Sequence, residues 1–405
     1  MIFHCKYEEA KKMRDVYIVG VGMHPWGKFE NKIFTQLGEV AVAEALKDAD
    51  ITWDKIGAIM SGILIYGGNA GHLSGQYIES VFGETGVPVV NVYNACATGS
   101  AAIRMAHNSI AAGETDTALA VGVDISPKGF LTAKSKDPKA DRDVLRWQMA
   151  GMPNPVYWAL ECRKRFEKYG DTEDVLADIK VQLSQYGSKN PNARYKKIYT
   201  REQVLGSVMV CDPLRLFEIC ATSDGAAAVI LSSDPKTIAR ANKPVRIAAT
   251  TMGSAIYGDP TIRISALSAP SKAEAPLLSE SYSASQQAYE KAGIGPEDID
   301  ILELPDNSSW HYLQYLETCG FCGEGQAAKM FSDGLTKIGG KVAVNPSGGF
   351  SSFGEAIGAQ AIWQVVEASN QLRGRCGERQ VKDAQVAMAQ TYGLMGNSGT
   401  TILTI

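Results

Sequence analysis

The sequence predicts an α/β protein built from two similar βαβαβαββ halves. Forty glycines punctuate short β-branched runs, and these runs alternate with helical stretches along the 405 residues. Alternation of this kind is typical of layered α/β folds. The order of elements in the first half also recurs in the second half, which indicates an internal duplication.

In the first half, each expected strand is a short β-branched or small-residue run, and the runs are separated by amphipathic or small-residue helices. Strands are expected at 16–23, 56–64, 87–94, 117–125 and 226–234, with helices at 35–49, 72–82 and from about 96 to 112. The helix after the third strand is rich in Ala, Gly and Ser, so it can approach its neighbours closely.

The second half repeats this order. Its strands are expected at 245–253, 298–307, 341–349, 385–393 and 400–405, with a helix at 281–292 and a small-residue helix after the third strand. The segments ALKDADITWDKIGAIMSG and YEKAGIGPEDIDILELPD align from helix end to strand. A strand order shared over five elements is much less common by chance than a single matching pair.

A long excursion separates the last two strands of the first half. We therefore expect an N-terminal half at 1–125 and 226–243, a loop domain at 126–225 and a C-terminal half at 244–405. The excursion carries a set of basic residues, interrupted by three aspartates: Lys134, Lys136, Lys139, Arg142 and Arg146. This pattern fits either an anion-binding site or a solvated surface loop of mixed charge.

Composition excludes several classes of protein. A net charge of -4 and a pI near 5.9 argue against a nucleic-acid binder. No stretch approaches the roughly 20 apolar residues that span a bilayer, and the charged N-terminus lacks a signal-peptide core. Eight scattered cysteines do not form a secreted disulfide framework, so we expect a cytoplasmic protein.

Cys319 and Cys322 form a CxxC pair without a second pair of ligands, so no metal site is expected.

Cys96, in VYNACATGSAAIRMA, is the candidate nucleophile. It lies where a strand ends and a helix begins, and unpaired N–H groups at a helix N-terminus favour a thiolate. The same N–H groups can hold the oxyanion that develops when an acyl group transfers to sulfur. A buried structural cysteine is the competing interpretation of this local pattern.

The stretch NACATGSAA resembles the nucleophile motif of thiolases, particularly their sterol-carrier-protein-x branch. Further segments are similar to that branch in its order: 153–172, 212–220, 223–233, 344–360 and 371–381. The resemblance implies a five-layered α/β/α/β/α thiolase fold with a loop domain inserted in the first half. It also implies a cysteine that accepts an acyl group from a CoA thioester, in a reaction that has coenzyme A as a substrate or product.

Two acid–base positions depart from the family pattern. The Gly-His-Pro box of the family reads Gly-Glu-Ala here, so Glu355 replaces a histidine, and the His-Asp-Cys-Phe box reads Pro-Asp-Asn-Ser, with Asn307 at its third position. The family's oxyanion site would use the backbone N–H groups of Cys96 and Gly393. Thr391 lies near a position where other thiolases keep a cysteine.

None of the five histidines falls at a family histidine position; we expect His24 to pack locally and His311 to lie on a helix surface or pack locally. Glu355 could deprotonate a thiol only if burial raises its pKa toward neutrality and the two groups share a proton.

Three functions remain open. The first is a thiolase-like acyltransferase acting on an unusual 3-oxoacyl-CoA, with cleavage of benzoylsuccinyl-CoA to benzoyl-CoA and succinyl-CoA as the specific candidate. The second is a CoA-thioester retro-aldolase, which needs no acyl-cysteine, and the third is a non-catalytic scaffold. The resemblance further implies a homodimer formed through the strand before Cys96, a small zinc-ribbon/OB-fold partner protein, and CoA contacts from the loop domain.

Overall fold

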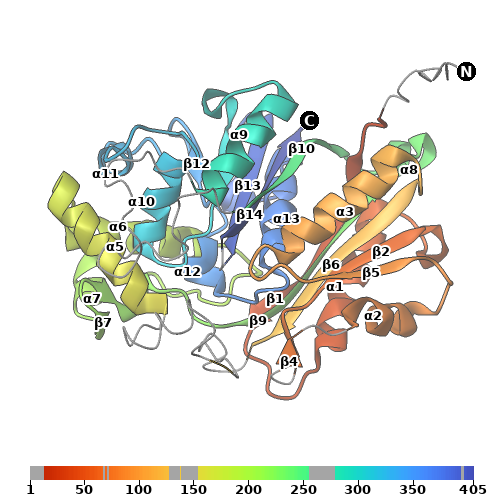
Figure 1. The fold of residues 1–405 in the computed structure, drawn as a ribbon, viewed down its shortest axis with the longest axis horizontal. Coiled ribbons are helices and arrows are strands. Elements are labelled where there is room, and N and C mark those ends of the chain that lie inside the picture. The colour runs from red at the N-terminus through yellow and green to blue at the C-terminus, as the bar shows by residue number, and fades with distance from the viewer. Residues whose placement is uncertain are drawn as a thin grey trace, which may run out of the picture.

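The computed structural model describes residues 13–66, 69–70, 73–126, 137, 154–254, 279–393 and 396–405. Within these residues the main strands form one 10-stranded sheet, and two short hairpins stand apart from it (Figure 1). The sheet strands of the N-terminal half are β1 (Tyr17–Gly27), β2 (Ala58–Gly62), β5 (Val89–Val92), β6 (Thr117–Ile125) and β9 (Asp224–Ser232). Those of the C-terminal half are β10 (Val245–Ser254), β11 (Ile301–Glu303), β12 (Ala343–Val344), β13 (Val386–Gly393) and β14 (Asn397–Thr404). The hairpins pair β3 (Ile65–Tyr66) with β4 (Asn69–Ala70) and β7 (Met209–Cys211) with β8 (Leu214–Arg215).

The two halves have the same strand order. The N-terminal half runs β5-β2-β6-β9-β1 and the C-terminal half runs β12-β11-β13-β14-β10, so each reads third, second, fourth, fifth, first. The pairing directions also agree, because the second strand is parallel to the third and fourth while the fifth is antiparallel to its neighbours. The predicted duplication is therefore confirmed. The halves join where Tyr17 and Ile18 of β1 pair with Arg246 and Val245 of β10.

Helices cover both faces of these strands. The longer helices are α1 (Phe34–Ala49), α2 (Ser74–Phe82), α3 (Thr98–Ala112), α9 (Glu280–Ala292), α10 (Ser309–Thr318) and α13 (Gln360–Leu372). Helices α3 and α13 contact each other and strands of both halves, so they form the central layer. Helices α1 and α2 pack on the outer face of the N-terminal half, and α9 packs on that of the C-terminal half. This accounts for the apolar runs of β6 and β9, which are buried along almost their whole length because helices cover both faces.

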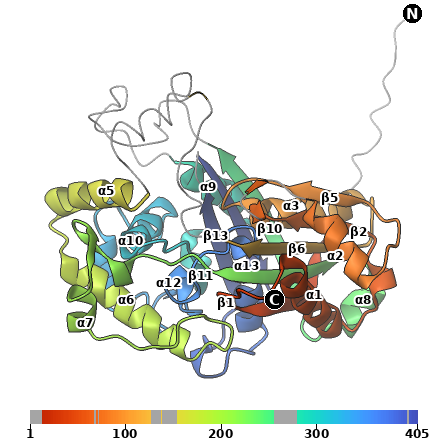
Figure 2. The ribbon, with the colours of Figure 1, turned by 90° about the horizontal axis from the view of Figure 1, so that it is seen from below.

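The segment between β6 and β9 packs on the C-terminal half. It contains α5 (Asn154–Tyr169), α6 (Glu173–Ser188) and α7 (Arg201–Leu205), which Figures 1 and 2 place beside α10 and α12 (Gly349–Phe353), away from α1 and α2. The remaining short helices are α8 (Pro235–Arg240) and α11 (Ala327–Ser332). Arg165 of α5 makes a buried, two-pronged ion pair with Glu317 of α10 at 2.7 and 2.9 Å. The division into three domains at the predicted boundaries stays a prediction.

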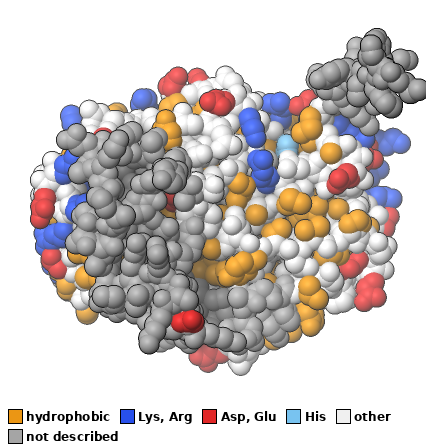
Figure 3. Space-filling view, in the orientation of Figure 1, with side chains coloured by type: hydrophobic (Ala, Val, Ile, Leu, Met, Phe, Trp, Pro, Cys, Tyr) orange, Lys and Arg blue, Asp and Glu red, His pale blue; other side chains and the backbone are white. Residues whose placement is uncertain are grey.

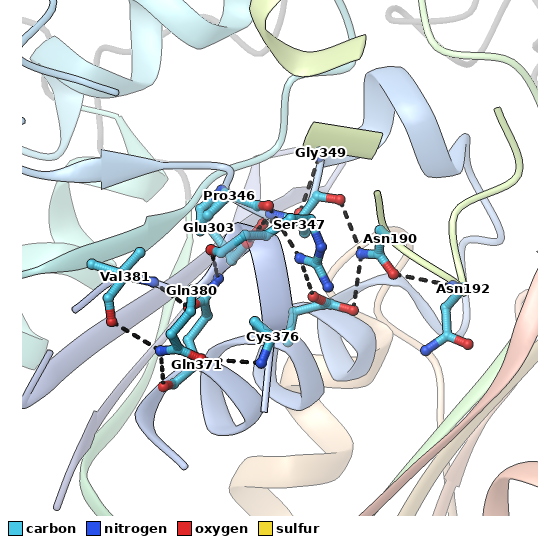
Figure 4. A network of polar contacts seen from close by, with 12 residues as sticks. Asn190, Asn192, Glu303, Pro346, Ser347, Gly349, Gln371, Cys376, Gln380 and Val381 are labelled. Atoms are coloured by element: carbon cyan, nitrogen blue, oxygen red, sulfur yellow. Dashed lines mark hydrogen bonds and ion pairs between the residues drawn. The ribbon is translucent and has the colours of Figure 1, made fainter. Parts of the chain in front are cut away.

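A buried polar network strengthens this attachment (Figure 4). The amide of Asn190, just after α6, donates to the carbonyl of Ser347 at 2.9 Å and to Glu367 at 3.1 Å. Glu367 in turn accepts from Arg379 at 3.0 Å, and the Ser347 hydroxyl donates to Glu303 at 2.7 Å. Burial raises the pKa of Glu303 well above its ordinary value. The network holds the ends of β11 and β12, from which the loops of the candidate site depart.

Candidate active site

A tight turn presents Cys96 between β5 and α3. Ala95 adopts a left-handed conformation with φ of 45°. The turn is closed by hydrogen bonds from the Ala97 nitrogen to the Asn94 carbonyl at 3.0 Å and from the Thr98 nitrogen to the Ala95 carbonyl at 3.1 Å. The Thr98 hydroxyl accepts from the Asn94 nitrogen and donates to the Ala95 carbonyl. The helix therefore begins two residues later than predicted, and Cys96 lies just ahead of its positive end.

The side chain of Cys96 is largely enclosed, with 7% of the residue exposed. It packs with Leu64 and Ile357 in a small apolar cluster. Its carbonyl accepts from the Gln360 side chain at 3.3 Å. At the end of β13, a Cβ added to Gly393 would lie 3.0 Å from the Ala97 nitrogen. Gly393 thus lies beside the turn that holds Cys96, and its role there stays a prediction.

The other two predicted site residues meet each other. Glu355 and Asn307 are both buried, and the Asn307 amide donates to the Glu355 carboxyl. The strand-like segment 219–223 lies between their backbones. Its Cys220 nitrogen donates to the Asn307 carbonyl at 2.9 Å, and its Ala221 carbonyl accepts from the Glu355 nitrogen at 2.8 Å. Two loops far apart in sequence are therefore held together by a third.

The loop that carries Glu355 is also fixed against β6. The Gly358 nitrogen donates to the Asp124 carboxylate at 2.9 Å. A Cβ on Gly122 would lie 2.3 Å from the Gly358 carbonyl oxygen, so the loop could not approach β6 this closely if Gly122 had a side chain.

Burial sets the protonation of the carboxyl groups here. It raises the pKa of Glu355 to about 7, against the opposing effect of hydrogen bonds from Cys220 and Asn307. It also raises the pKa of Asp306 to about 7, although Asp306 accepts from the Phe350 and Ser351 nitrogens at the start of α12. A carboxyl group with a pKa near 7 can both take and return a proton at neutral pH.

Cys220 is a residue of this site that the sequence analysis missed. It is half-buried, its thiol is hydrogen-bonded to Glu355, and a charge on Cys96 raises its pKa, so the two sulfurs lie within electrostatic range. The segment DPLRLFEIC carried a family resemblance but gave no sign of a role for its last residue. Only the packing of segment 219–223 between the Asn307 and Glu355 loops identifies it.

Several other sequence predictions have structural outcomes. His311 does not lie on a helix surface: it is buried, and its Nδ1 is 2.9 Å from the Ser308 hydroxyl and 3.1 Å from the Ser308 nitrogen. Burial lowers its pKa to about 3, so it stays neutral. His24 packs locally, with Nδ1 2.6 Å from the Pro25 carbonyl. The Thr391 hydroxyl donates to Gln364 at 2.6 Å.

The proposed CoA-binding residues Lys134, Lys136, Lys139, Arg142 and Arg146 lie outside the described residues. Within the described part of the chain, there is no group of three or more His, Cys, Asp or Glu side chains that could hold a metal ion. A search of the same residues found no helix with both the length and the apolar character needed to cross a membrane.

Comparison with known proteins gives matches over nearly the whole chain. Residues 16–143 match the family model for the thiolase N-terminal domain, and residues 265–405 match that for the thiolase C-terminal domain-like family. The chain is 34% identical over 397 residues to sterol carrier protein 2 of Bos taurus, covering 94% of this chain and 70% of that protein. It is 32% identical over 406 residues to an acetyl-CoA acetyltransferase of Methanothermobacter thermautotrophicus, covering 97% and 99%. It is also 32% identical over 392 residues to the benzoylsuccinyl-CoA thiolase subunit BbsB of Thauera aromatica, covering 95% and 96%.

Solved structures share the fold. The chain superposes on the Ltp2-ChsH2(DUF35) aldolase with a TM-score of 0.80 and 22% identity, covering 96% of this chain and 98% of that one. Human mitochondrial 3-ketoacyl-CoA thiolase gives a TM-score of 0.70 with 16% identity, covering 97% and 99%.

Proposed function

Because this chain belongs to the thiolase family, we propose that Cys96 takes the acyl group of an unusual 3-oxoacyl-CoA, with coenzyme A as substrate or product. The observation that carries the proposal is the turn that holds Cys96 ahead of α3, with Gly393 against it and a buried Glu355 nearby in the fold. A scaffold protein has no need of this arrangement around a thiol.

Each predicted residue has a role in the proposed reaction. Glu355 accepts the proton of the Cys96 thiol, and a pKa of about 7 suits a base that works at neutral pH. The backbone N–H groups of Cys96 and Gly393 stabilise the oxyanion of the tetrahedral intermediate. Asn307 orients Glu355 through its amide and can donate to an enolate oxygen. The basic residues between 134 and 146 would bind the CoA phosphates.

The first experiment detects the acyl-enzyme. Incubation with an acyl-CoA should add one acyl group to the protein, and peptide mass spectrometry should place it on Cys96. Cys96→Ser should lose the adduct and the turnover, whereas Cys162→Ser, at a buried free cysteine of α5, should retain both. If wild-type protein forms no adduct with any acyl-CoA tried, the chain is not an acyltransferase of this type, and the retro-aldolase and scaffold alternatives remain.

We propose benzoylsuccinyl-CoA as the substrate, cleaved to benzoyl-CoA and succinyl-CoA. The similarity to the benzoylsuccinyl-CoA thiolase subunit BbsB, which extends over nearly the full length of both chains, supports it. The test is condensation of benzoyl-CoA with succinyl-CoA by the purified chain, alone and with a co-expressed zinc-ribbon/OB-fold partner. Absence of product in both preparations would remove this substrate and leave the acyl-transfer chemistry to be tested with others.

Retro-aldol cleavage of a CoA thioester is the second candidate. It is favoured by the replacement of a family histidine with Glu355, because this cleavage needs proton transfer but no acyl-cysteine. The chain also shares its fold with the Ltp2-ChsH2(DUF35) aldolase. Cys96→Ser separates the two reactions: an aldolase should keep its turnover, and a thiolase should lose it.

We also propose a homodimer that forms through β5. This strand is at the edge of the sheet and its residues are only half-buried. Exposed apolar side chains surround it on α2, on α3 and in the turn before Cys96: Leu73, Tyr77, Val81, Tyr93 and Met105. Figure 3 shows apolar side chains gathered on the face where α3 and β5 lie in Figure 1. A stable monomer in size-exclusion light scattering would contradict this assembly.

We further propose a partner protein and a cytoplasmic location. A small zinc-ribbon/OB-fold partner is supported by the similarity to BbsB, which is named as one subunit of its enzyme. Co-purification of the chain with such a protein tests it. A cytoplasmic location fits the free thiols of the described cysteines and is tested by fractionation of the source cells.

A further inference from the structure

We propose that Cys220 is a second catalytic thiol, which donates the proton to the α-carbon of the acyl-CoA that leaves after C–C cleavage. The inference rests on the proposed thiolase function and adds to it a residue that neither family box supplied. Proton transfer at the α-carbon is thereby assigned to a cysteine in segment 219–223. This segment is separate from the two family boxes, which carry Asn307 and Glu355.

The backbone around Cys220 is fixed on both sides by the other site loops. Ile219 pairs with Ser308 and Thr222 pairs with Glu355 in isolated bridges. Between these bridges, the Cys220 nitrogen donates to the Asn307 carbonyl at 2.9 Å. The position of the thiol is therefore determined by the same two loops that carry Asn307 and Glu355.

The thiol itself faces reactive groups. It is hydrogen-bonded to the Glu355 carboxyl, and it lies close enough to Cys96 for the two sulfurs to interact electrostatically. A nucleophilic thiol, a carboxyl group and a second thiol thus converge from three loops that are far apart in the sequence.

An independent observation indicates that a ligand group binds here. The side-chain oxygen Oδ1 of Asn307 is buried and has no hydrogen-bond partner, and only 4% of the residue is exposed. A buried acceptor without a donor is costly and needs an explanation, such as a solvent molecule or ligand that binds beside it. Since the Asn307 amide is bonded to Glu355, that ligand would lie next to the Cys220–Glu355 pair.

The surroundings keep Cys220 protonated and so make it a donor. Burial raises its pKa well above the ordinary value, and the carboxyl groups of Glu355 and Asp306 and the Cys96 sulfur act in the same direction. Lys180, whose ammonium donates to Ser351, and the phenol of Tyr195 also lie within electrostatic range of Cys220. Of these groups only Lys180 is a cation, and its charge does not reverse the rise in the pKa of Cys220.

The proton and electron movements balance. Glu355 takes the proton of Cys96 as its sulfur bonds to the ketone carbon. The C–C bond then breaks, its electron pair passes to the α-carbon, and that carbon takes the proton of the Cys220 thiol. The proton held by Glu355 moves to the Cys220 sulfur along their hydrogen bond. Cys96 is left acylated and Cys220 and Glu355 are restored; in the second half, CoA takes the acyl group and its thiol proton returns through Glu355 to Cys96.

The test separates the two proton transfers. Wild type, Cys220→Ala and Cys220→Ser are compared in acylation of Cys96 by benzoyl-CoA, followed by mass spectrometry, and in exchange of the α-hydrogens of succinyl-CoA in deuterium oxide. Cys220→Ala should keep Cys96 acylation and lose about 10²-fold or more of the exchange rate, as expected for loss of a general acid–base group. Cys220→Ser, which keeps the size of the side chain, should lose exchange as well.

Cys319→Ala is the matched control, because Cys319 is a buried thiol that is hydrogen-bonded to Ser285 away from the site. It should change neither measurement. Exchange at the wild-type rate in Cys220→Ala would overturn the inference while leaving the proposed function intact. Equal loss of acylation and exchange would also overturn it, since that result assigns Cys220 a structural role. Failure of the wild-type protein to form a Cys96 adduct with benzoyl-CoA or with any other acyl-CoA tried would remove the proposed function itself.

Discussion

Substitution of Glu355 by Gln should change how the stability of the protein depends on pH. Burial raises the pKa of Glu355 from 4.5 to about 7. The unfolded chain ionises this carboxyl group at a lower pH than the folded protein does, so ionisation opposes folding. The destabilisation is absent at low pH, grows as the pH rises from 4.5 to about 7, and is complete above that range. Its full size is about 3 kcal/mol, at roughly 1.4 kcal/mol for each tenfold change in proton affinity.

The Gln side chain keeps the shape of Glu355 but does not titrate. The unfolding free energy of Glu355→Gln, measured relative to wild type, should therefore rise by about 3 kcal/mol between about pH 4.5 and pH 8. Urea unfolding at several pH values measures this difference, and subtraction of the wild-type curve cancels the contributions of other groups. Glu30→Gln, at an exposed carboxyl, is the control. A difference that stays constant with pH would refute the reasoning, because it would mean that Glu355 ionises alike in both states.

Three further substitutions test the packing around the site. Gly393→Ala would place a methyl group 2.2 Å from the Asn397 side-chain oxygen and 3.0 Å from the Ala97 nitrogen. We expect the rate of acyl-adduct formation, measured by mass spectrometry, to fall and the unfolding free energy, measured in urea, to drop by about 1–3 kcal/mol. Arg379→Met leaves the buried Glu367 carboxylate without its ion-pair partner and should lower the unfolding free energy by about 3–5 kcal/mol; a smaller loss when Glu367→Gln is added would confirm the cause. Trp363→Ala should lower the unfolding free energy, measured in urea, by about 3–5 kcal/mol, because it leaves a cavity in the core between the halves.

Much of the fold could be predicted because the same order of strands and helices is recognisable in both halves of the sequence. The prediction was least accurate at the second and third strands of the C-terminal half. There the sequence suggested strands at 298–307 and 341–349, but β11 and β12 contain only 301–303 and 343–344. Pro305 and Pro346 lack the N–H group that would continue a ladder, and Asn345 turns the chain with φ of 47°. The apolar runs continue beyond these points because the loops are buried, not because they are strands.

Cys96, Glu355, Asn307 and Gly393 could be proposed from the sequence because each follows a recognisable strand or box; their roles stay predictions. Cys220 was not predictable, since its role depends on contacts with two loops that are remote in sequence. For His311, local packing is the expectation that the structure bears out, whereas a position on the helix surface was wrong. His311 lies in the first turn of α10, and Trp158 of α5 covers it with the ring centroids 4.8 Å apart. Helix α5 belongs to the inserted segment, whose docking site on the C-terminal half has no signal in the local pattern.

The duplication also places the proposed nucleophile in one half and the proposed acid–base residues Glu355 and Asn307 in the other. In both halves, the loop after the third strand contains a residue other than glycine in the left-handed conformation: Ala95 in the first and Asn345 in the second. In the first half this turn presents Cys96. In the second half the Asn345 side chain accepts from the Leu304 nitrogen at 2.7 Å and donates to Asp306 at 2.7 Å. It thereby fixes the loop that leads to Asn307. The turn after β5 holds the proposed nucleophile, and its counterpart after β12 fixes the loop that carries Asn307. We therefore expect substitutions at Asn345 to lower the rate of the proposed reaction by displacing that loop.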